Sequence, residues 1–348
     1  MAQALAISTA EKKRLLGCIR LFSKASVLVV GDLILDQFIW GKVDRISPEA
    51  PVPVVNVERE SYMPGGSLNV AANIHSLGGR VYPCGVVGRD REGRGLLKLM
   101  RRQGIDTGGI VYDKARPTSL KTRIIAHSQQ VVRFDREKTG DVSAEDIKKI
   151  LQFVRHKISE VDVVILEDYG KGVIQPQLLK EVVRLAKRAQ KPVLVDPKEK
   201  NIPYYAGVTA ITPNRKEAYG AAEALGGRKE RSLEEVGREL LKKLKCEFVL
   251  ITLGEGGMAL FDRQGGLVKI PTAAREVYDV SGAGDTVIAV FGLALASGAA
   301  SREAAMLSNL AAGVVVGKLG TALVLPGELE KVLDLYTSNG RGAAKAKA

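Results

Sequence analysis

The segment Val161–Asp196, VDVVILEDYGKGVIQPQLLKEVVRLAKRAQKPVLVD, decides the fold of this chain. It contains two short, nearly continuous apolar runs, Val161–Leu166 and Pro192–Val195, and acidic residues follow each run. Runs of this kind are typical of strands that are covered on both faces. Residues 176–189, between the two runs, have the pattern of a helix. Strand, helix and strand in this order predict two parallel strands joined by a right-handed crossover.

The same alternation extends over most of the 348 residues. Further strand-like runs lie at Val27–Val30, Val208–Ile211 and Phe248–Ile251, and further helical patterns at Lys216–Leu225 and Ser232–Leu244. The sequence therefore predicts one large α/β domain with a parallel sheet. Nearly every predicted strand ends in a polar or acidic residue. Since ligands gather at the carboxyl ends of parallel strands, we expect the functional site there.

Two segments interrupt the alternation. Gln37–Tyr62 contains three prolines within Ser47–Pro53, and Thr118–Asp135 alternates β-branched and polar residues. Prolines and alternation indicate exposed or edge strands. We expect these segments to form a small β-sheet that projects from the main domain as a lid or dimer surface. Two ordinary surface hairpins are the alternative.

The predicted domain organisation has three parts. Residues 1–24 form an N-terminal helical extension, residues 25–338 the main domain with the lid strands at about 37–62 and 118–135, and residues 339–348 a basic disordered tail. The three cysteines, Cys18, Cys84 and Cys246, form no CxxC motif. This spacing excludes a disulfide framework and suits a reducing compartment. No secretion signal is recognisable, and the most apolar stretch, 287–300, is too short to span a bilayer. We expect a cytoplasmic protein without a membrane partner.

The net charge of +13 raises the question of nucleic-acid binding. More than half of this excess lies in residues 1–24 and 340–348, which leaves a modest surplus for the rest of the chain. Aromatic residues are 5% of the chain and do not alternate with basic residues, as they would in a surface that stacks bases. The remaining surplus suits a small anionic substrate, and no nucleic-acid partner is expected.

The motif richest in chemistry is Asp279–Thr286, DVSGAGDT, which precedes the apolar helical pattern 287–296. Gly282, Ala283 and Gly284 expose backbone N–H groups at the start of a helix, where an anion or a transferring phosphoryl group can bind. Asp285 falls in the first turn beside that anion. A carboxylate there suits a general base that takes the proton of an attacking hydroxyl. The alternative is that Asp285 caps the helix and the glycines make a tight turn.

Together with a second motif, this segment resembles the two signatures of the PfkB/ribokinase family of sugar kinases. The second motif is Pro64–Asn73, PGGSLNVAAN, followed by Leu77-Gly78. The resemblance implies a ribokinase-like three-layer α/β/α fold with a mostly parallel central sheet and a small β-sheet lid. It also implies an ATP-dependent carbohydrate kinase that uses Mg²⁺ and forms a homodimer through the lid. Dependence on a monovalent cation stays open.

Further segments resemble, within that family, the bacterial heptose-7-phosphate kinases of lipopolysaccharide-core synthesis. They include Gly31–Asp36, Arg45–Pro53, Lys121–Arg123, Asp168–Gly172 and Asp196–Lys198, and the likeness covers about residues 25–335. It implies transfer of the ATP γ-phosphate to the anomeric O1 of D-glycero-D-manno-heptose 7-phosphate, without the nucleotidyltransferase domain that is fused to some relatives. The alternatives are a kinase of ribose, fructose 6-phosphate or a related sugar, and a non-catalytic protein that binds sugar or nucleotide.

The resemblance also assigns roles to individual residues. Sugar hydroxyls would be bound by Asp36, Gly65, Gly66, Asn69 and Asp168, with Asp32 a weaker candidate. The substrate phosphate would be bound by Lys121, Arg123, Arg133, Lys171 and Lys198. The nucleotide would be bound by Asn214, Glu217, Thr252, Gly254, Gly257 and Asn309, with Glu217 an indirect ligand of Mg²⁺.

Each of these assignments has a structural alternative. Asp168 can be a polar strand cap, and any single basic residue can simply be solvated. Asn214 can cap a helix, Gly254–Gly257 can form a hairpin turn, and Asn309 can pack in the core.

Overall fold

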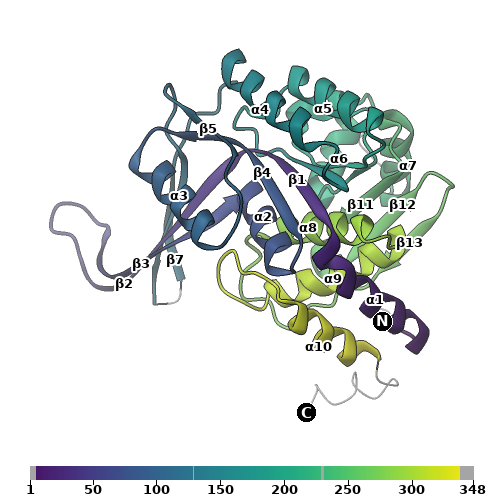
Figure 1. The fold of residues 1–348 in the computed structure, drawn as a ribbon. Helices are drawn as coiled ribbons and strands as arrows, with labels where there is room; N and C mark the ends of the chain where they lie inside the picture. The colour runs from purple at the N-terminus through teal and green to yellow at the C-terminus, as the bar shows by residue number, and fades with distance from the viewer. Residues whose placement is uncertain (1–4, 128, 229–230, 338–348) are drawn as a thin grey trace, which may run out of the picture.

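The computed structural model describes residues 5–127, 129–228 and 231–337, and a large mixed sheet lies at its centre (Figure 1). The strands of this sheet are β1 (Ser26–Gly31), β4 (Arg80–Gly88), β5 (Gly109–Asp113), β8 (Val163–Glu167), β9 (Val193–Asp196), β10 (Ala210–Ile211), β11 (Phe248–Thr252), β12 (Met258–Asp262) and β13 (Leu267–Ile270). Their order is β13-β12-β11-β10-β9-β8-β1-β4-β5. All neighbours pair in parallel except β11 with β12 and β12 with β13.

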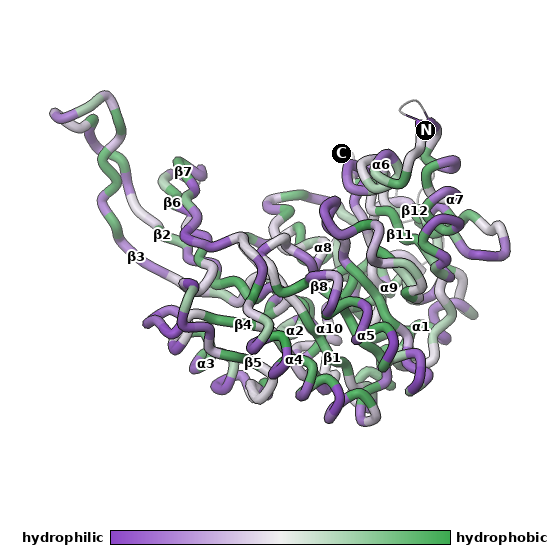
Figure 2. The backbone as a smooth tube through the Cα atoms, turned by 90° about the horizontal axis from the view of Figure 1, so that it is seen from above, coloured by the Kyte–Doolittle hydropathy of each residue, from purple (hydrophilic) through white to green (hydrophobic). Residues whose placement is uncertain are grey.

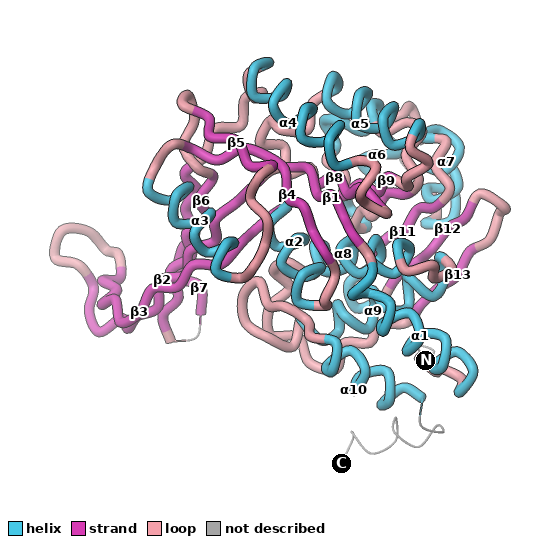
Figure 3. Tube along the Cα trace, in the orientation of Figure 1, coloured by secondary structure: helices cyan, strands magenta, loops and turns pink. Residues whose placement is uncertain are grey.

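Helices cover both faces of this sheet (Figure 3). They are α1 (Thr9–Leu21), α2 (Ser67–Ser76), α3 (Arg91–Arg102), α4 (Ala144–Lys157), α5 (Pro176–Arg188), α6 (Arg215–Ala224), α7 (Leu233–Leu244), α8 (Ala283–Ala296), α9 (Ser301–Val315) and α10 (Pro326–Thr337). Apolar side chains of α4, α5, α6 and α7 form one core cluster and those of the other helices form a second. In β1, Val27 and Val29 face one cluster while Leu28 and Val30 face the other. This is why β1 reads as an uninterrupted apolar run.

A second, smaller sheet projects from the body, as Figure 2 shows from above. Its strands are β2 (Leu33–Ile46), β3 (Pro53–Gly66), β6 (Ser119–Ala126) and β7 (Gln129–Arg136), in the order β3-β2-β6-β7. We call this sheet the lid. The predicted small sheet is thereby confirmed, although β2 and β6 are its internal strands and only β3 and β7 are edges. The long β2–β3 hairpin has two register shifts, at Trp40/Gly41 and at Val43/Arg45.

The predicted α/β class with a mostly parallel sheet and a lid is confirmed. The N-terminal segment is more than an extension, because α1 buries Leu15, Cys18 and Ile19 in the same core cluster as α8 and α9. The predicted tail, 339–348, lies outside the described residues. Within the described ranges, every helix is too short or too polar to cross a membrane.

Candidate active site

Asp285 lies at the start of α8 and is almost completely buried, with 2% of its surface exposed. Its two carboxylate oxygens accept hydrogen bonds from two different elements. The hydroxyl of Tyr169 donates to Oδ1 at 2.6 Å, and the side-chain amide of Asn69 in α2 donates to Oδ2 at 2.7 Å. Because each carboxylate oxygen has a second lone pair, both contacts leave Asp285 able to accept one more proton or hydrogen bond.

Gly282 is the N-cap of α8 and has a positive φ of 77°. A Cβ atom at this position would lie 2.5 Å from the side-chain nitrogen of Asn69. Two features of this position therefore require glycine: the left-handed backbone conformation, and the close approach of Asn69, which donates a hydrogen bond to Asp285. The sequence predicted a tight turn and a functional loop as alternatives, and this geometry combines them.

The amides at this helix end are not all free. The N–H of Ala283 donates to the carbonyl of Val280 at 3.2 Å. In the described residues, the N–H groups of Gly284 and Asp285 have no acceptor. Of the predicted anion-binding amides at 282–284, that of Ala283 is thus engaged, whereas those of Gly282 and Gly284 have no acceptor among the described residues. An anion at the N-terminus of α8 would meet the amides of Gly284 and Asp285, together with the positive end of the helix dipole.

Burial raises the pKa of Asp285 to about 6, and the negative charge of Asp36 acts in the same direction. The hydrogen bonds from Tyr169 and Asn69 act in the opposite direction because they stabilise the ionised carboxylate. A pKa near 6 leaves the group ionised at neutral pH and still basic enough to accept a proton. This is the range in which a general base works well.

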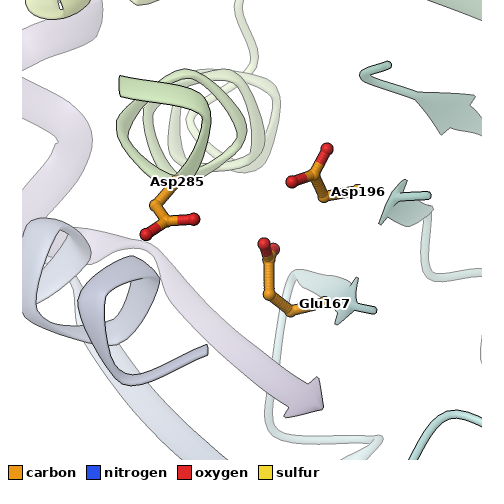
Figure 4. Close-up of side chains that lie close together, drawn as sticks. All are labelled: Glu167, Asp196 and Asp285. Carbon is orange, nitrogen blue, oxygen red and sulfur yellow. The ribbon is translucent and has the colours of Figure 1, made fainter. Parts of the chain in front are cut away.

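Two more carboxylates lie beside Asp285, and sequence reasoning had not identified them as a site (Figure 4). Glu167 ends β8 and Asp196 ends β9, and one oxygen of each lies within 4.8 Å of one oxygen of Asp285. Glu167 is completely buried, and neither of its oxygens receives a hydrogen bond from a donor group of the described residues. Burial and the neighbouring negative charges raise the pKa of Glu167 far above its ordinary value, and burial raises that of Asp196 to about 8.

The available sequence signal was the acidic residue at the end of each of these two strands. Because β8 and β9 are adjacent and parallel, their carboxyl ends lie side by side, with Glu167 opposite Asp196. A buried carboxylate without a donor needs a proton or a cation. Oxygen ligands of this kind suit a divalent cation such as Mg²⁺, so the residues present fit a metal.

The predicted sugar-binding residues gather on the other side of Asp285. Asp36 of β2 is buried, and Gly65 of β3 lies against it, since a Cβ at Gly65 would be 2.1 Å from the Asp36 carboxylate. Gly66 directly precedes α2, which carries Asn69. Arg123 of β6 donates to Asp36 at 2.5 Å. Arg123 thus holds a predicted sugar contact in place, and its charge is already balanced.

Asp168 has the surroundings of a structural residue. One carboxylate oxygen accepts hydrogen bonds from Asn201 at 2.7 Å and from the hydroxyl of Tyr205 at 2.5 Å. The other accepts the backbone N–H of Gly170 at 2.7 Å. With 3% of its surface exposed, Asp168 has the contacts of the polar strand cap that the sequence offered as the alternative.

The predicted phosphate-binding cations differ in how they are paired. Arg133 pairs with Asp135 at 2.6 Å, Lys171 with Glu137 at 2.5 Å and Lys198 with Glu217 at 2.7 Å. Lys121 is the one among the five that makes no ion pair with any described residue. Its Nζ lies 5.0 Å from the centre of the Tyr169 ring, and burial lowers its pKa. A phosphate beside Lys121 would stabilise the charged form of this side chain.

A cavity of about 510 Å³ adjoins the N-terminus of α8. It is lined by Thr252, Gly254, Gly257 and Asn309, four of the six predicted nucleotide-binding residues, and by Ala283 and Gly284. Its apolar wall, which the sequence did not identify, includes Met258, Val280, Val287, Ala312 and Val316. The side-chain nitrogen of Asn309 donates to the carbonyl of Pro271, which fixes α9 against this cavity.

Asn214 and Glu217 do not line this cavity. They form a capping box at the start of α6, in which each side chain bonds the backbone N–H of the other. This is the capping role that the sequence offered as an alternative for Asn214. Glu217 also forms an ion pair with Lys198. Two residues before Lys198 lies Asp196, which belongs to the group of carboxylates formed by Glu167, Asp196 and Asp285.

This chain is similar to known proteins in sequence and in fold. The chain is 48% identical over 322 residues to "Bifunctional protein HldE" of Geobacter sulfurreducens, an alignment that covers 92% of this chain and 65% of that protein. It is 46% identical over 310 residues to the protein of the same name from Wolinella succinogenes, covering 89% and 65%. The chain thus spans less than two thirds of the length of these relatives.

Among solved structures, Escherichia coli phosphofructokinase-2 in complex with substrates and products matches with a TM-score of 0.73 and 17% identity, covering 90% of this chain and 100% of that chain. At this identity the match concerns the fold alone. The model of the pfkB family carbohydrate kinases matches residues 24–327, nearly the whole of the described structure. Since that match includes the lid, both glycine motifs and the nucleotide-side cavity, the chain belongs to the pfkB family of carbohydrate kinases.

Proposed function

We propose that this chain transfers the γ-phosphate of ATP to the anomeric O1 of D-glycero-D-manno-heptose 7-phosphate, which gives the 1,7-bisphosphate. The step belongs to the formation of ADP-heptose for the lipopolysaccharide core. The proposal is supported by the resemblance to heptose-7-phosphate kinases and by 43–48% identity to eight HldE proteins. Three buried cysteines without disulfides suit a reducing compartment, and we place the reaction in the cytoplasm.

The observation that carries the proposal is the position of Asp285. It is buried, oriented by two donors, and placed between the sugar-side residues and a cavity of the size of a nucleotide. At the same helix end lie the amides of Gly284 and Asp285, which have no acceptor in the part of the chain that the structure describes. A structural cap would need neither the second donor nor the free amides, whereas an in-line phosphoryl transfer needs a base and an anion site next to each other.

In the proposed reaction, Asp285 accepts the proton of the anomeric hydroxyl as the oxygen attacks the γ-phosphorus. A new O–P bond forms, the bond from the γ-phosphorus to the β,γ-bridging oxygen breaks, and its electron pair leaves with ADP. The amides of Gly284 and Asp285 stabilise the negative charge on the transferred group. Since the reacting atoms meet at the start of α8, the helix dipole acts in the same direction.

A divalent cation would be held by Glu167 and Asp196, whose oxygens lie close together. Neither oxygen of Glu167 has a hydrogen-bond partner among the described residues, and one oxygen of Asp196 accepts the hydroxyl of Thr212 at 3.3 Å. When bound, it would neutralise negative charge on the nucleotide phosphates. The predicted ligand Glu217 is engaged with Lys198 and with the cap of α6, so a role through water is the one that its surroundings leave open. Without a cation, Glu167 and Asp196 repel each other unless one of them is protonated.

At the other end of the substrate, Lys121 is the best candidate for the 7-phosphate. It lies on the lid, opposite Asp36 in the β2–β6 register, and makes no ion pair with a described residue. Burial lowers the pKa of Lys121, and the charges of Arg133 and Lys171 act in the same direction, while those of Asp36 and Asp135 act in the opposite direction. A dianionic phosphate would stabilise the charged form of Lys121 and replace the water that it loses on burial.

The lid also supports the proposed homodimer. Six large apolar side chains are exposed on its strands and hairpin turn: Ile46, Val52, Val57, Val131, Val132 and Phe134. Exposed apolar groups in this number favour an interface between two copies. Light scattering of the wild type and of a Phe134→Glu variant tests this, because the variant should be monomeric if the lid forms the contact.

A panel of sugars and sugar phosphates, assayed with ATP and Mg²⁺ by ADP release, tests the substrate. Heptose 7-phosphate should have the highest kcat/KM, above fructose 6-phosphate, ribose and non-phosphorylated heptose. A preference for ribose or fructose 6-phosphate would replace heptose as the substrate and leave the kinase chemistry intact. No turnover with any sugar, despite measurable ATP binding, would refute the catalytic role.

A further inference from the structure

A buried carboxylate outside the loop that follows β8, residues 168–173, binds three of the loop's backbone N–H groups. Asp32, directly after β1, has 1% of its surface exposed. One of its oxygens accepts the backbone N–H groups of Tyr169 and Lys171, both at 2.9 Å, and the other accepts that of Val173 at 3.0 Å. These three hydrogen bonds come from the main chain of one short loop. Asp32 therefore helps to fix the loop, and three hydrogen bonds already occupy its carboxylate.

This loop brings Tyr169 to Asp285. The phenol hydroxyl donates to Oδ1 at 2.6 Å, while Asn69 donates to Oδ2 at 2.7 Å. Two donors on two different oxygens prevent the carboxylate from rotating about its bond to Cβ. The ring is fixed as well, because Lys121 lies over its face at 5.0 Å. The backbone N–H of Tyr169 is bound by Asp32, so both ends of this residue are held.

A hydroxyl nucleophile can use Asp285 only if a free lone pair of the carboxylate points at it. Rotation of the carboxylate would move that lone pair, and small errors in geometry reduce the rate strongly. Asn69 alone fixes one oxygen and leaves this rotation possible. The second hydrogen bond removes it. The role of Tyr169 thus differs from substrate binding, since its hydroxyl is already directed at the base.

We propose that Tyr169 is a positioning residue for Asp285, and that Asp32 acts on the reaction through the loop that presents Tyr169. The inference rests on the proposed role of Asp285 as the base. Neither Tyr169 nor Asp32 needs to touch the substrate. Removal of the phenol hydroxyl should therefore lower kcat and leave the KM values for ATP and sugar phosphate unchanged.

The test is Tyr169→Phe, which removes one oxygen and keeps the ring under Lys121. Loss of a hydrogen bond to a charged group predicts a fall in kcat of about 10-fold to 100-fold, with both KM values within about twofold of wild type. Tyr219→Phe is the matched control, because it also deletes a phenol hydrogen bond, to the carbonyl of Arg231, but lies on α6. Its kcat should equal that of wild type.

A double-mutant cycle separates positioning from independent effects. In an Asp285→Asn background, the further change Tyr169→Phe should alter kcat by less than about twofold, because the base through which Tyr169 acts has been removed. An equal loss in both backgrounds, a raised KM with unchanged kcat, or no effect in either background would overturn the proposal. Thermal melts followed by circular dichroism establish that each variant is folded.

Asp32→Asn provides a second, independent arm. The amide keeps one acceptor oxygen for the loop and replaces the other oxygen by an NH₂ group. The change should therefore lower kcat when it is made in the wild type, and should lower it no further when it is made in the Tyr169→Phe variant. If Asp32→Asn lowers kcat equally in both, the two residues act separately and the loop argument is wrong. The proposed function fails on different evidence, namely an Asp285→Asn variant that turns over like wild type, or a wild type without kinase activity.

Discussion

Replacement of Asp285 by asparagine should have two opposite effects, a large loss of activity and a gain of stability. The amide is nearly isosteric with the carboxylate. Its oxygen can accept the hydrogen bond from Asn69, and its NH₂ group can donate to the hydroxyl oxygen of Tyr169. Both contacts are therefore kept, and in the contact with Tyr169 the donor and the acceptor are exchanged. The fold and the binding of both substrates should therefore be retained.

The loss of activity follows from the loss of the base. General base catalysis contributes about 10²–10⁴ in rate, so kcat should fall by at least about 10²-fold with little change in either KM. ADP release at saturating ATP and sugar phosphate measures kcat, and equilibrium binding of ATP checks the cavity. An exposed substitution, Asp141→Asn, should change neither quantity.

The gain of stability follows from the raised pKa of Asp285. The value rises from 3.8 to about 6, and at about 1.4 kcal/mol per unit the buried ionised form costs on the order of 3 kcal/mol. A raised pKa means that the folded protein binds this proton more tightly than the unfolded chain does. Stability therefore falls as the pH rises from about 4 to about 6, and the full loss is present above pH 6.

Asparagine has no such ionisation. At pH 8 and without divalent cations, Asp285→Asn should melt about 4 °C above wild type, given 348 residues, and the difference should shrink towards zero near pH 4. Differential scanning fluorimetry at the two pH values measures both. Near-wild-type turnover, or a lower melting temperature at pH 8, would refute the reasoning about this residue.

Gly282→Ala should lower kcat at least 10-fold, because the new Cβ meets the side-chain amide of Asn69 that orients Asp285, and should destabilise the folded protein by about 1–2 kcal/mol. Gly298→Ala is the control: its φ is similarly positive but the space around its Cβ is open, so it should lower the stability and leave kcat unchanged. Lys121→Met should raise KM for the sugar phosphate at least 10-fold in initial-rate assays and leave KM for ATP unchanged; equal effects on non-phosphorylated sugars would contradict it. Ala312→Trp should occupy part of the cavity of about 510 Å³ and raise KM for ATP but not for sugar, and a raised sugar KM would place the nucleotide elsewhere. The pH profile of kcat/KM should rise about tenfold per unit below pH 6 and level off above it, as Asp285 loses its proton; a flat profile between pH 5 and 8 would exclude an ionised base with this pKa.

The main sheet could be predicted from the sequence because its central strands are buried on both faces. In β1 every residue from Ser26 to Gly31 is buried, and so the run is apolar without interruption. Helix ends were also readable, since Asn214 and Ser232 are each followed three residues later by a glutamate and form capping boxes. These signals involve residues that are close together in the chain, and so they can be recognised without the structure.

The contacts of Asp285 and Asp36 could not be predicted, because they join residues that are distant in the chain. Tyr169 and Asp285 are 116 positions apart, and Arg123 and Asp36 are 87 positions apart. Which cations remain unpaired depends on the lid register. In that register Arg123 lies opposite Arg133, and Lys121 lies opposite Asp135. Of the five predicted phosphate-binding cations, Lys121 is nevertheless the one without an ion pair to a residue that the structure describes. Pairing of this kind is decided by packing and not by composition.

The two register shifts in the β2–β3 hairpin have a consequence for how such enzymes diverge. The half of the hairpin next to the body carries Asp36 and Gly65, and the shifts at Trp40/Gly41 and Val43/Arg45 separate it from the outer half. A bulge absorbs changes in twist and strand length locally. Substitutions or insertions beyond Gly41 can therefore alter the outer half without moving the groups that we propose to bind the sugar. Evolution can change the proposed dimer surface and the proposed sugar site of this protein one at a time.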